Sequence, residues 1–281
     1  MTTPAATIGL LHPGAMGSSI GAAATGNARV LWASEGRSGA TAERAQRAGL
    51  QDAGSVEALV AASDAIMSVC PPHAAEDVAR RVAGLGFSGT YLDANAVSPA
   101  TARSVAAIVG EAGARFVDGG IVGGPAWKPG TTRLYLAGEA AAEAARWFEG
   151  SPLDVVVIEG GAGAASTLKM TYAAYTKGST ALVASILAVA RREGVETALR
   201  AEWGISQPRL IAGLERQLQG AAPKAWRWVG EMEEISATFE AAGLPGGFHA
   251  AAADLYGRLD RYRDADPPPS VDEIVDAALG D

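Results

Sequence analysis

Short apolar runs alternate with helical patterns through the first half of the chain. The runs are rich in β-branched residues and predict strands at Thr7–Leu11, Arg29–Ala33, Ala65–Val69, Thr90–Asp93, Arg115–Asp118, Arg133–Ala137 and Val155–Ile158. Helical patterns fill most of the intervals, as at Ser55–Ala62, His73–Ala83 and Pro99–Ala112. Strands that alternate with helices in this way predict a doubly wound parallel sheet with helices on both faces, an α/β fold.

The pattern changes after about Gly160. No convincing strand follows, and long helical patterns run over Ala164–Arg192 and Pro223–Ala242. The second pattern ends at "GLPGG", a helix terminator, and carries an apolar stripe of Trp228, Val229, Met232, Ile235 and Phe239. We therefore expect two domains, an α/β domain over residues 1–160 and an all-α domain over residues 161–281.

Two helix starts are marked by their capping residues. Ser98 precedes Pro99, and this pair predicts a helix whose first amides are capped by the serine hydroxyl. Near the C-terminus, Ser270 and Glu273 have the spacing of a capping box, directly after a run of prolines. The last segment is therefore expected to be a short helix behind a stiff spacer.

The amino-acid composition limits the kinds of partner that the protein is expected to bind. Hydrophobic residues make up 48% and charged residues 19% of the 281 positions, as in an ordered soluble protein. The net charge of −8 gives no electrostatic reason to expect nucleic acid or an anionic membrane as a partner. The lone Cys70 excludes an internal disulfide and suits the reducing cytoplasm, where we expect the protein. The three histidines are too dispersed to suggest a metal site.

Two segments need to be tested as membrane or export signals. The N-terminus, "MTTPAATIGLL", lacks the basic residue and long apolar run of a signal peptide. The stretch "MTYAAYTKGSTALVASILAVA" is the most apolar, but Lys177 and Gly178 interrupt it. We expect a helix buried on all sides, with a partner subunit as one possible cover.

The loop after the first expected strand reads "HPGAMG". Gly14 and Gly17 have the spacing of the second and third glycines of the dinucleotide fingerprint, while His12 stands at the position of the first. Pro13 is expected to hold His12 in extended geometry, and the amides from Gly14 through Ala15 to Met16 would then bind phosphate. The alternative is a simple proline–glycine turn. A preceding strand and a following helix of small residues favour the phosphate loop.

The second expected strand ends in "LWASEGRS", where such domains read the adenosine ribose. If Glu35 accepts hydrogen bonds from the ribose hydroxyls, NAD is the cofactor. If Ser34, Arg37 and Ser38 face the ribose, they pair a 2′-phosphate and NADP is the cofactor. The hydroxyl groups around an arginine favour NADP over NAD. A solvated loop without a role is the third possibility.

Four blocks occur in order: "IGLLHPGAMGSSI", "LDANAVSP", "FVDGGIVGGPAWKPGTTRLYLAG" and "GAGAASTLKM". Together they resemble the β-hydroxyacid dehydrogenase and 6-phosphogluconate dehydrogenase superfamily, which includes imine reductases. "WVGEMEEISATFEAAGLPGG" further resembles a subgroup whose helical C-terminal domain has no settled role. The resemblance implies an N-terminal Rossmann domain, a helical C-terminal domain, an active site between them, and a homodimer formed through the helical domain.

The resemblance also implies site residues. Lys169 stands at the position of the family's catalytic lysine. Asn95 stands at the position of a family serine that touches nicotinamide or substrate, and its alternative role is that of a turn residue. Pro71 would lie beside the cofactor. The substrate loop falls on residues 118–124, so Gly123 and Gly124 would offer amides to the substrate, and Val122 replaces the expected serine.

Lys169 is the expected general acid or base. Hydride transfer from a carbinol carbon leaves a hydroxyl proton, and a lysine whose pKa is lowered by partial burial accepts it. The alternative for Lys169 is a solvated position on the helix surface. Ala173 stands where the family has an asparagine, and Tyr172 is the candidate replacement for its polar group. Glu231 would select a polar or cationic substrate, or simply pair with Arg227 on an exposed face.

Three functions remain open from the sequence. The first is an NADP-dependent oxidoreductase that interconverts the carbonyl and alcohol of a small polar molecule, with Lys169 moving the proton. The second is an imine reductase, which the altered polar residues permit. The third is a dinucleotide-binding redox sensor without catalysis, because the Rossmann fold alone does not establish chemistry.

Overall fold

The computed structural model describes residues 6–280, and the chain divides into two compact units, Met1–Met170 and Thr171–Asp281. The domain boundary expected after residue 160 precedes the long helix in which this division falls. Part of the segment considered above as a signal peptide, residues 1–5, lies outside the described residues.

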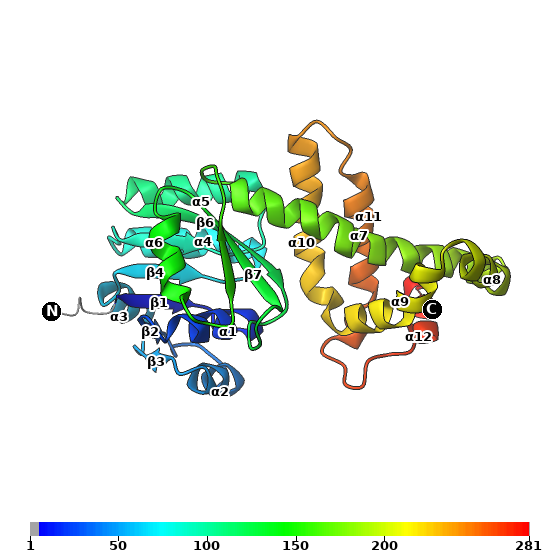
Figure 1. Cartoon of the computed structure of the whole chain (residues 1–281), viewed down its shortest axis with the longest axis horizontal. Coiled ribbons are helices and arrows are strands. Elements are labelled where there is room, and N and C mark those ends of the chain that lie inside the picture. The colour runs from blue at the N-terminus through cyan, green and yellow to red at the C-terminus, as the bar shows by residue number, and fades with distance from the viewer. Residues whose placement is uncertain (1–5, 281) are drawn as a thin grey trace. The chain divides into compact units, whose positions relative to one another are not determined.

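The first unit is built on one eight-stranded sheet (Figure 1). Its strands are β1 (Thr7–Leu11), β2 (Arg29–Trp32), β3 (Gln51–Asp52), β4 (Ala65–Ser68), β5 (Thr90–Asp93), β6 (Arg115–Gly123), β7 (Thr132–Ala137) and β8 (Asp154–Val157). They lie in the order β3-β2-β1-β4-β5-β6-β7-β8. The first six follow the strand order of a Rossmann fold, in which the order switches sides between β1 and β4. Such folds bind their ligands at the carboxyl ends of the strands at this switch point.

Helices cover both faces of this sheet, as the alternating pattern predicted. They are α1 (Ala15–Ala24), α2 (Gly39–Arg47), α3 (Val56–Ala61), α4 (Ala75–Gly84), α5 (Pro99–Glu111) and α6 (Ala141–Ala145). Ile8 and Leu10 point into a core with α1, α2 and α6, whereas Leu11 points into a second core with α3, α4 and α5. Because side chains alternate along a strand, β1 feeds both cores and is buried on both sides.

The sheet differs from the expected one in three ways. The strand β3 was missed because its two residues are polar and exposed, and only its pairing with β2 defines it. The strand β6 continues past Asp118 to Gly123. The strand β7 runs antiparallel to β6, so the predicted parallel sheet carries one antiparallel pairing. The reason is the short connection over residues 124–131, since a parallel return needs a crossover of a dozen or more residues.

The second unit is helical, and no strand occurs in the described part of the chain after β8. Its helices are α7 (Ala164–Arg192), which begins in the first unit, α8 (Glu196–Ser206), α9 (Pro208–Ala221), α10 (Ala225–Ala241), α11 (Gly247–Arg258) and α12 (Val271–Leu279). The bounds of α7 are those predicted, and α10 begins two residues inside its predicted range. The sequence pattern did not separate α8, α9 and α11.

The helix α7 is long and apolar enough to pass a length and hydropathy test for a membrane span, with a mean hydropathy of 1.3. However, 56% of its most apolar window is buried within the protein. The helix is therefore a core helix, as the interruption by Lys177 and Gly178 suggested.

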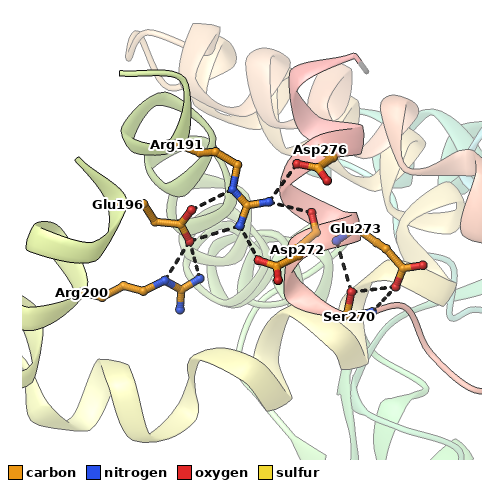
Figure 2. A network of polar contacts seen from close by, with 7 residues as sticks. All are labelled: Arg191, Glu196, Arg200, Ser270, Asp272, Glu273 and Asp276. Atoms are coloured by element: carbon orange, nitrogen blue, oxygen red, sulfur yellow. Dashed lines mark hydrogen bonds and ion pairs between the residues drawn. The ribbon is translucent and has the colours of Figure 1, made fainter. Parts of the chain in front are cut away.

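One arginine holds the C-terminal helix in place (Figure 2). The Arg191 Nε donates to Glu196 at 2.7 Å, and Nη1 donates to Asp276 at 2.8 Å and to the carbonyl of Asp272 at 3.0 Å. Its Nη2 also pairs with the Asp272 carboxylate. The predicted capping box is confirmed, since Ser270 and Glu273 exchange side-chain and backbone hydrogen bonds at the start of α12. One guanidinium therefore ties α7, α8 and α12 together.

Candidate functional site

The candidate cofactor site lies in the first unit, at the carboxyl ends of the neighbouring strands β1 and β4. Its floor is the loop between β1 and α1. His12 has φ of +65°, and the Gly14 amide donates to the His12 carbonyl at 2.8 Å, so Pro13 is the centre of a three-residue turn. The prediction that Pro13 holds His12 extended was wrong. The chain reverses within two residues here, and this tight turn requires the left-handed conformation that a glycine usually supplies.

The two glycines of the loop have different jobs. A Cβ on Gly17 would lie 2.4 Å from the His12 carbonyl oxygen, so only glycine permits α1 to pack this closely on the loop. A Cβ on Gly14 would meet nothing within 4 Å. Gly14 is the N-cap of α1 and offers no side-chain cap, so the space in front of the first amides of the helix is open.

These amides fit an anion. The Gly14 amide is already bonded within the turn, and the first intrahelical bond runs from the Ser18 amide to the Gly14 carbonyl. Of the predicted phosphate-binding amides, those of Ala15 and Met16 therefore remain for a ligand. The positive end of the helix dipole adds to their attraction for a phosphate. The open N-terminus of α1 therefore suits the pyrophosphate of a dinucleotide.

The segment after β2 gathers hydroxyl and guanidinium groups at the start of α2. Ser38 is the N-cap of α2, and its hydroxyl lies 3.1 Å from that of Thr41, to which Arg44 donates at 2.9 Å. Ser34 donates its amide to Asp52 at 3.2 Å. Arg37 is exposed. Thr41 and Arg44 join the predicted Ser34, Arg37 and Ser38 in this segment. Steps of three residues, from Ser38 to Thr41 and from Thr41 to Arg44, were the available signal.

Asn95 lies in a buried polar cluster after β5 and is only 2% exposed. Its Oδ1 accepts from the Cys70 amide at 2.6 Å, and its Nδ2 donates to Ser68 and to Asp93, each at 3.1 Å. Burial raises the pKa of the Cys70 thiol to about 12, so this thiol is inert. The contacts give Asn95 the role of holding the loops after β4 and β5, and its contact with nicotinamide stays a prediction. Pro71, in the loop after β4, is exposed.

Two aspartates lie side by side where β5 and β6 end their parallel pairing. Asp93 and Asp118 are partners in the strand register, and both are buried. Asp118 accepts hydrogen bonds from the Ser166 hydroxyl at 2.6 Å and from the Ser166 amide at 3.1 Å. Asp118 therefore fixes the first turn of α7 against the sheet.

Lys169 follows in the next turn of α7. A Cβ on Gly120 would lie 2.6 Å from the carbonyl of Ala165 and 3.2 Å from the Lys169 Cβ. Only a glycine in β6 permits the helix to pass so close to the strand. The structure thus brings Lys169 to β6, in the same unit as the phosphate loop.

The substrate loop predicted at residues 122–124 forms the start of the β6–β7 hairpin. Val122 is buried, and Gly123 has φ of +118° with its missing Cβ directed at the Thr131 carbonyl. Gly124 offers its carbonyl to the Thr132 hydroxyl at 2.6 Å. Further along the hairpin, the Ala126 amide donates to Ser19 of α1 at 3.0 Å. This bond, which the sequence did not reveal, ties the hairpin to the helix of the phosphate loop.

The other two predicted substrate residues lie in the second unit. Tyr172 is 48% exposed on α7. Glu231 of α10 forms an ion pair with Lys177 of α7, and the Lys177 ammonium lies 5.0 Å above the Trp228 ring. Arg227, considered above as a partner of Glu231, donates to Asp264 at 2.7 Å. Glu231 is therefore part of a mostly buried charge cluster rather than of an exposed helix face.

The buried aspartates predict a pH dependence of stability. Burial raises the pKa of Asp93 from 3.8 to about 7. Hydrogen bonds from Asn95 oppose this rise, and the charge of the Asp118 carboxylate adds to it. The folded state then binds the proton more tightly than the unfolded chain, so Asp93 stabilises the fold at low pH and this contribution is lost as the pH rises from about 4 to about 7. We expect a loss of about 4 kcal/mol over this range.

Asp93→Asn tests this expectation, because asparagine mimics the neutral acid at every pH. The free energy of unfolding, measured by urea denaturation between pH 4 and pH 8, should fall less steeply with pH in the variant than in the original chain. Asp254→Asn, on an exposed position of α11, serves as the control and should keep the original slope. Equal slopes for Asp93→Asn and the original chain would show that Asp93 is ionised throughout.

Two protein families match parts of this chain. Residues 6–147 match the family described as the NAD binding domain of 6-phosphogluconate dehydrogenase, and residues 190–259 match a domain of unknown function, DUF1932. Among curated proteins, a 28.5 kDa protein of Methanothermus fervidus, named by its place in the 5′ region of 7S RNA, is 32% identical over 161 residues. That match covers 57% of this chain and 61% of the relative, so the chain matches about three-fifths of that protein's length.

Solved structures share the whole architecture. A conserved protein described as similar to 3-hydroxyacid dehydrogenases is 25% identical, with a TM-score of 0.67 over 91% of this chain and 97% of its own. The 3-hydroxyisobutyrate dehydrogenase of Mycobacterium tuberculosis, solved with L-serine, is 18% identical with a TM-score of 0.68, over 96% and 98%. A reductive aminase of Aspergillus terreus, solved with an NADPH derivative, is 18% identical with a TM-score of 0.57, over 97% and 99%.

The family match covers the phosphate loop, the segment after β2 and the buried aspartates, and it is described as binding a nicotinamide dinucleotide. With its Rossmann strand order and helical second unit, the chain belongs to the 6-phosphogluconate dehydrogenase-like family of NAD-binding proteins.

Proposed function

We propose that this protein is an NADP-dependent oxidoreductase that interconverts the alcohol and carbonyl of a small polar molecule. The observation that carries the proposal is the position of Lys169. It packs against Gly120 of β6, in the same compact unit as the open N-terminus of α1. A proton-transferring group and a dinucleotide-binding loop on one rigid sheet are the two parts that such a reaction requires.

The first unit supplies the groups that would hold the cofactor. The Ala15 and Met16 amides would bind the pyrophosphate, and the groups after β2 would bind the adenosine ribose. When bound, the nicotinamide supplies the hydride acceptor or donor. The hairpin tied to α1 through Ser19 would close the site on one side and keep water from it.

Lys169 would move the substrate proton. In the oxidising direction the ε-amino group accepts the hydroxyl proton as the carbonyl forms, and in the reducing direction the ammonium returns it. The hairpin amides of Gly123 and Gly124 would orient an anionic substrate group, next to the apolar wall of Val122. Asp118 and Asn95 would position the elements around the reacting atoms.

Arg37 is the predicted determinant for NADP. Replacing it with alanine should raise the Kd for NADPH about tenfold or more and leave the Kd for NADH nearly unchanged, because only NADPH carries the 2′-phosphate that a guanidinium pairs with. Titration of both reduced cofactors by nicotinamide fluorescence measures the two constants. Arg47→Ala, at an exposed position near the end of α2, is the matched control. An equal loss of affinity for NADPH and NADH would show that Arg37 does not contact the 2′-phosphate.

Imine reduction is the second candidate. Val122 and Ala173 replace polar residues expected from the resemblance, and the loss of these polar groups would make the substrate site more apolar than that of a hydroxyacid dehydrogenase. A reductive aminase and an imine reductase are among the proteins that share the fold.

An assay of ketones, hydroxy acids and cyclic imines with NADPH tests both candidates together. Turnover of ketones or hydroxy acids that depends on Lys169 supports the proposal, and turnover confined to imines supports the second candidate. Binding of NADPH without turnover of any compound would favour a non-catalytic redox sensor.

We also propose that the protein is a homodimer formed through the second unit and located in the cytoplasm. One face of α7 exposes Tyr172, Tyr175, Leu182 and Val189, with exposed fractions from 45% to 78%. Their spacing of three, seven and seven residues keeps them on one stripe of the helix. An exposed apolar stripe of this length is typical of a subunit interface. Sedimentation equilibrium of the purified chain measures the mass of the particle.

A further inference from the structure

His12 is the residue that departs from the dinucleotide fingerprint, and its backbone is strained. Its φ of +65° lies in the left-handed region, where a Cβ is unfavourable and glycine is not. The residue also precedes a proline, which restricts it further. The chain therefore carries an imidazole at a position that glycine would occupy without strain. Strain of this kind gathers at binding sites, where the side chain has a use.

The environment of the ring leaves one polar atom available. The Nδ1 of His12 is sealed from solvent and has no hydrogen-bond partner in the described part of the chain. A ligand can therefore reach the ring only through Nε2. Burial lowers the pKa of His12 to about 4, and the charge of Arg37 contributes, so the imidazole is neutral at pH 7. A buried N–H without an acceptor is more costly than an unused lone pair, so the single proton belongs on Nε2.

The neighbours of His12 indicate which part of a ligand this N–H meets. The strands β1 and β2 are adjacent and parallel, so His12, directly after β1, and Arg37, in the turn after β2, stand at the same edge of the sheet. The charge of Arg37 contributes to the lowered pKa of His12, so the guanidinium lies close enough to act on the ring. In Rossmann domains this edge meets the adenosine ribose.

We propose that His12 is a specificity residue for the cofactor, whose Nε2–H donates to an oxygen of the adenosine 2′-phosphate alongside Arg37. The inference rests on the proposed function, because it assumes that NADPH binds at the phosphate loop. It assigns a ligand contact to the residue that replaces the first glycine. A phosphate is a strong acceptor for a neutral N–H donor, and the contact would offset the strain of the turn.

His12→Gly and His12→Asn test the proposal. Both residues adopt a positive φ readily, so both variants should keep the turn and melt at or above the temperature of the original chain. Neither can place a donor at the position of Nε2. We expect the Kd for NADPH, measured by nicotinamide fluorescence, to rise about tenfold or more in both variants, and the Kd for NADH to change less than threefold.

Other outcomes overturn the inference. If both variants bind NADPH as tightly as the original chain, the imidazole makes no contact. If only His12→Gly loses affinity, the loss comes from the flexibility of glycine. If NADPH and NADH weaken equally, His12 acts on a part that the cofactors share. A failure of the original chain to bind NADPH at all would instead contradict the proposed function, so the two failures are distinguishable.

Discussion

Lys169→Met is expected to lower turnover by about 10²- to 10⁴-fold while leaving the affinity for NADPH within a few-fold of the original value. Methionine preserves the apolar stem that packs near Gly120 but has no group that can take or return a proton. The reaction would then depend on water for the proton. The loss should appear in kcat, because the proton moves in the transition state and not in the bound ground state.

The matched control is Lys224→Met, at an exposed lysine in the second unit. This variant removes the same charge from the chain and should keep full turnover. Unchanged kcat in Lys169→Met, on a substrate found in the ketone, hydroxy acid and imine assay, would remove Lys169 from the mechanism. If the two variants lose the same amount of thermal stability, the loss comes from the removal of one positive charge and not from the position of Lys169.

Gly14→Asp is expected to abolish cofactor binding without harming the fold. The backbone of Gly14, with φ of −71°, is open to any residue, and a Cβ there meets nothing within 4 Å. Aspartate is among the best N-caps, so its carboxylate should bond the first amides of α1 and keep or slightly raise the melting temperature. The same carboxylate would occupy the place of the pyrophosphate and repel it, so the Kd for NADPH should rise about a hundredfold or more.

Gly14→Ala separates the charge from the loss of glycine. Alanine adds the same Cβ but neither a cap nor a charge, and it should bind NADPH within about fivefold of the original chain. If Gly14→Asp melts normally and still binds NADPH tightly, the dinucleotide does not lie at the N-terminus of α1. If Gly14→Ala loses affinity as Gly14→Asp does, contact with the glycine backbone, rather than the anion site, explains the effect.

Much of the fold could be predicted because the elements carry local signals. The strands β1 and β5 are short, mostly apolar runs that each begin with a threonine, and their bounds were predicted to the residue. The start of α5 at Pro99 and the capping box of α12 follow from hydrogen bonds between residues three apart, which a sequence shows directly. The position of Lys169 in the first turns of α7 follows equally from the helical pattern.

The missed features depend on contacts between distant segments. The strand β3 exists only through its pairing with β2, and the direction of β7 depends on the length of its connection. The role of Asn95 is decided by Ser68, Cys70 and Asp93, two of which come from another strand and its loop. Spacing along the chain cannot show that such side chains meet.

His12 shows the same limit at a single residue. The local rule for a residue before proline predicted an extended backbone. The tight passage from β1 to α1 overrode that rule, because Gly17 packs against the His12 carbonyl while the Gly14 amide donates to it. Packing between a strand and its helix decided the conformation here.

A nicotinamide dinucleotide is expected to bind at the carboxyl ends of the first unit's strands. Titration of the purified chain with NADPH, followed by the fluorescence of the reduced nicotinamide, measures this binding. We expect saturable binding of one NADPH per chain, with NADH bound more weakly. Absence of saturable binding for both NADPH and NADH would contradict it.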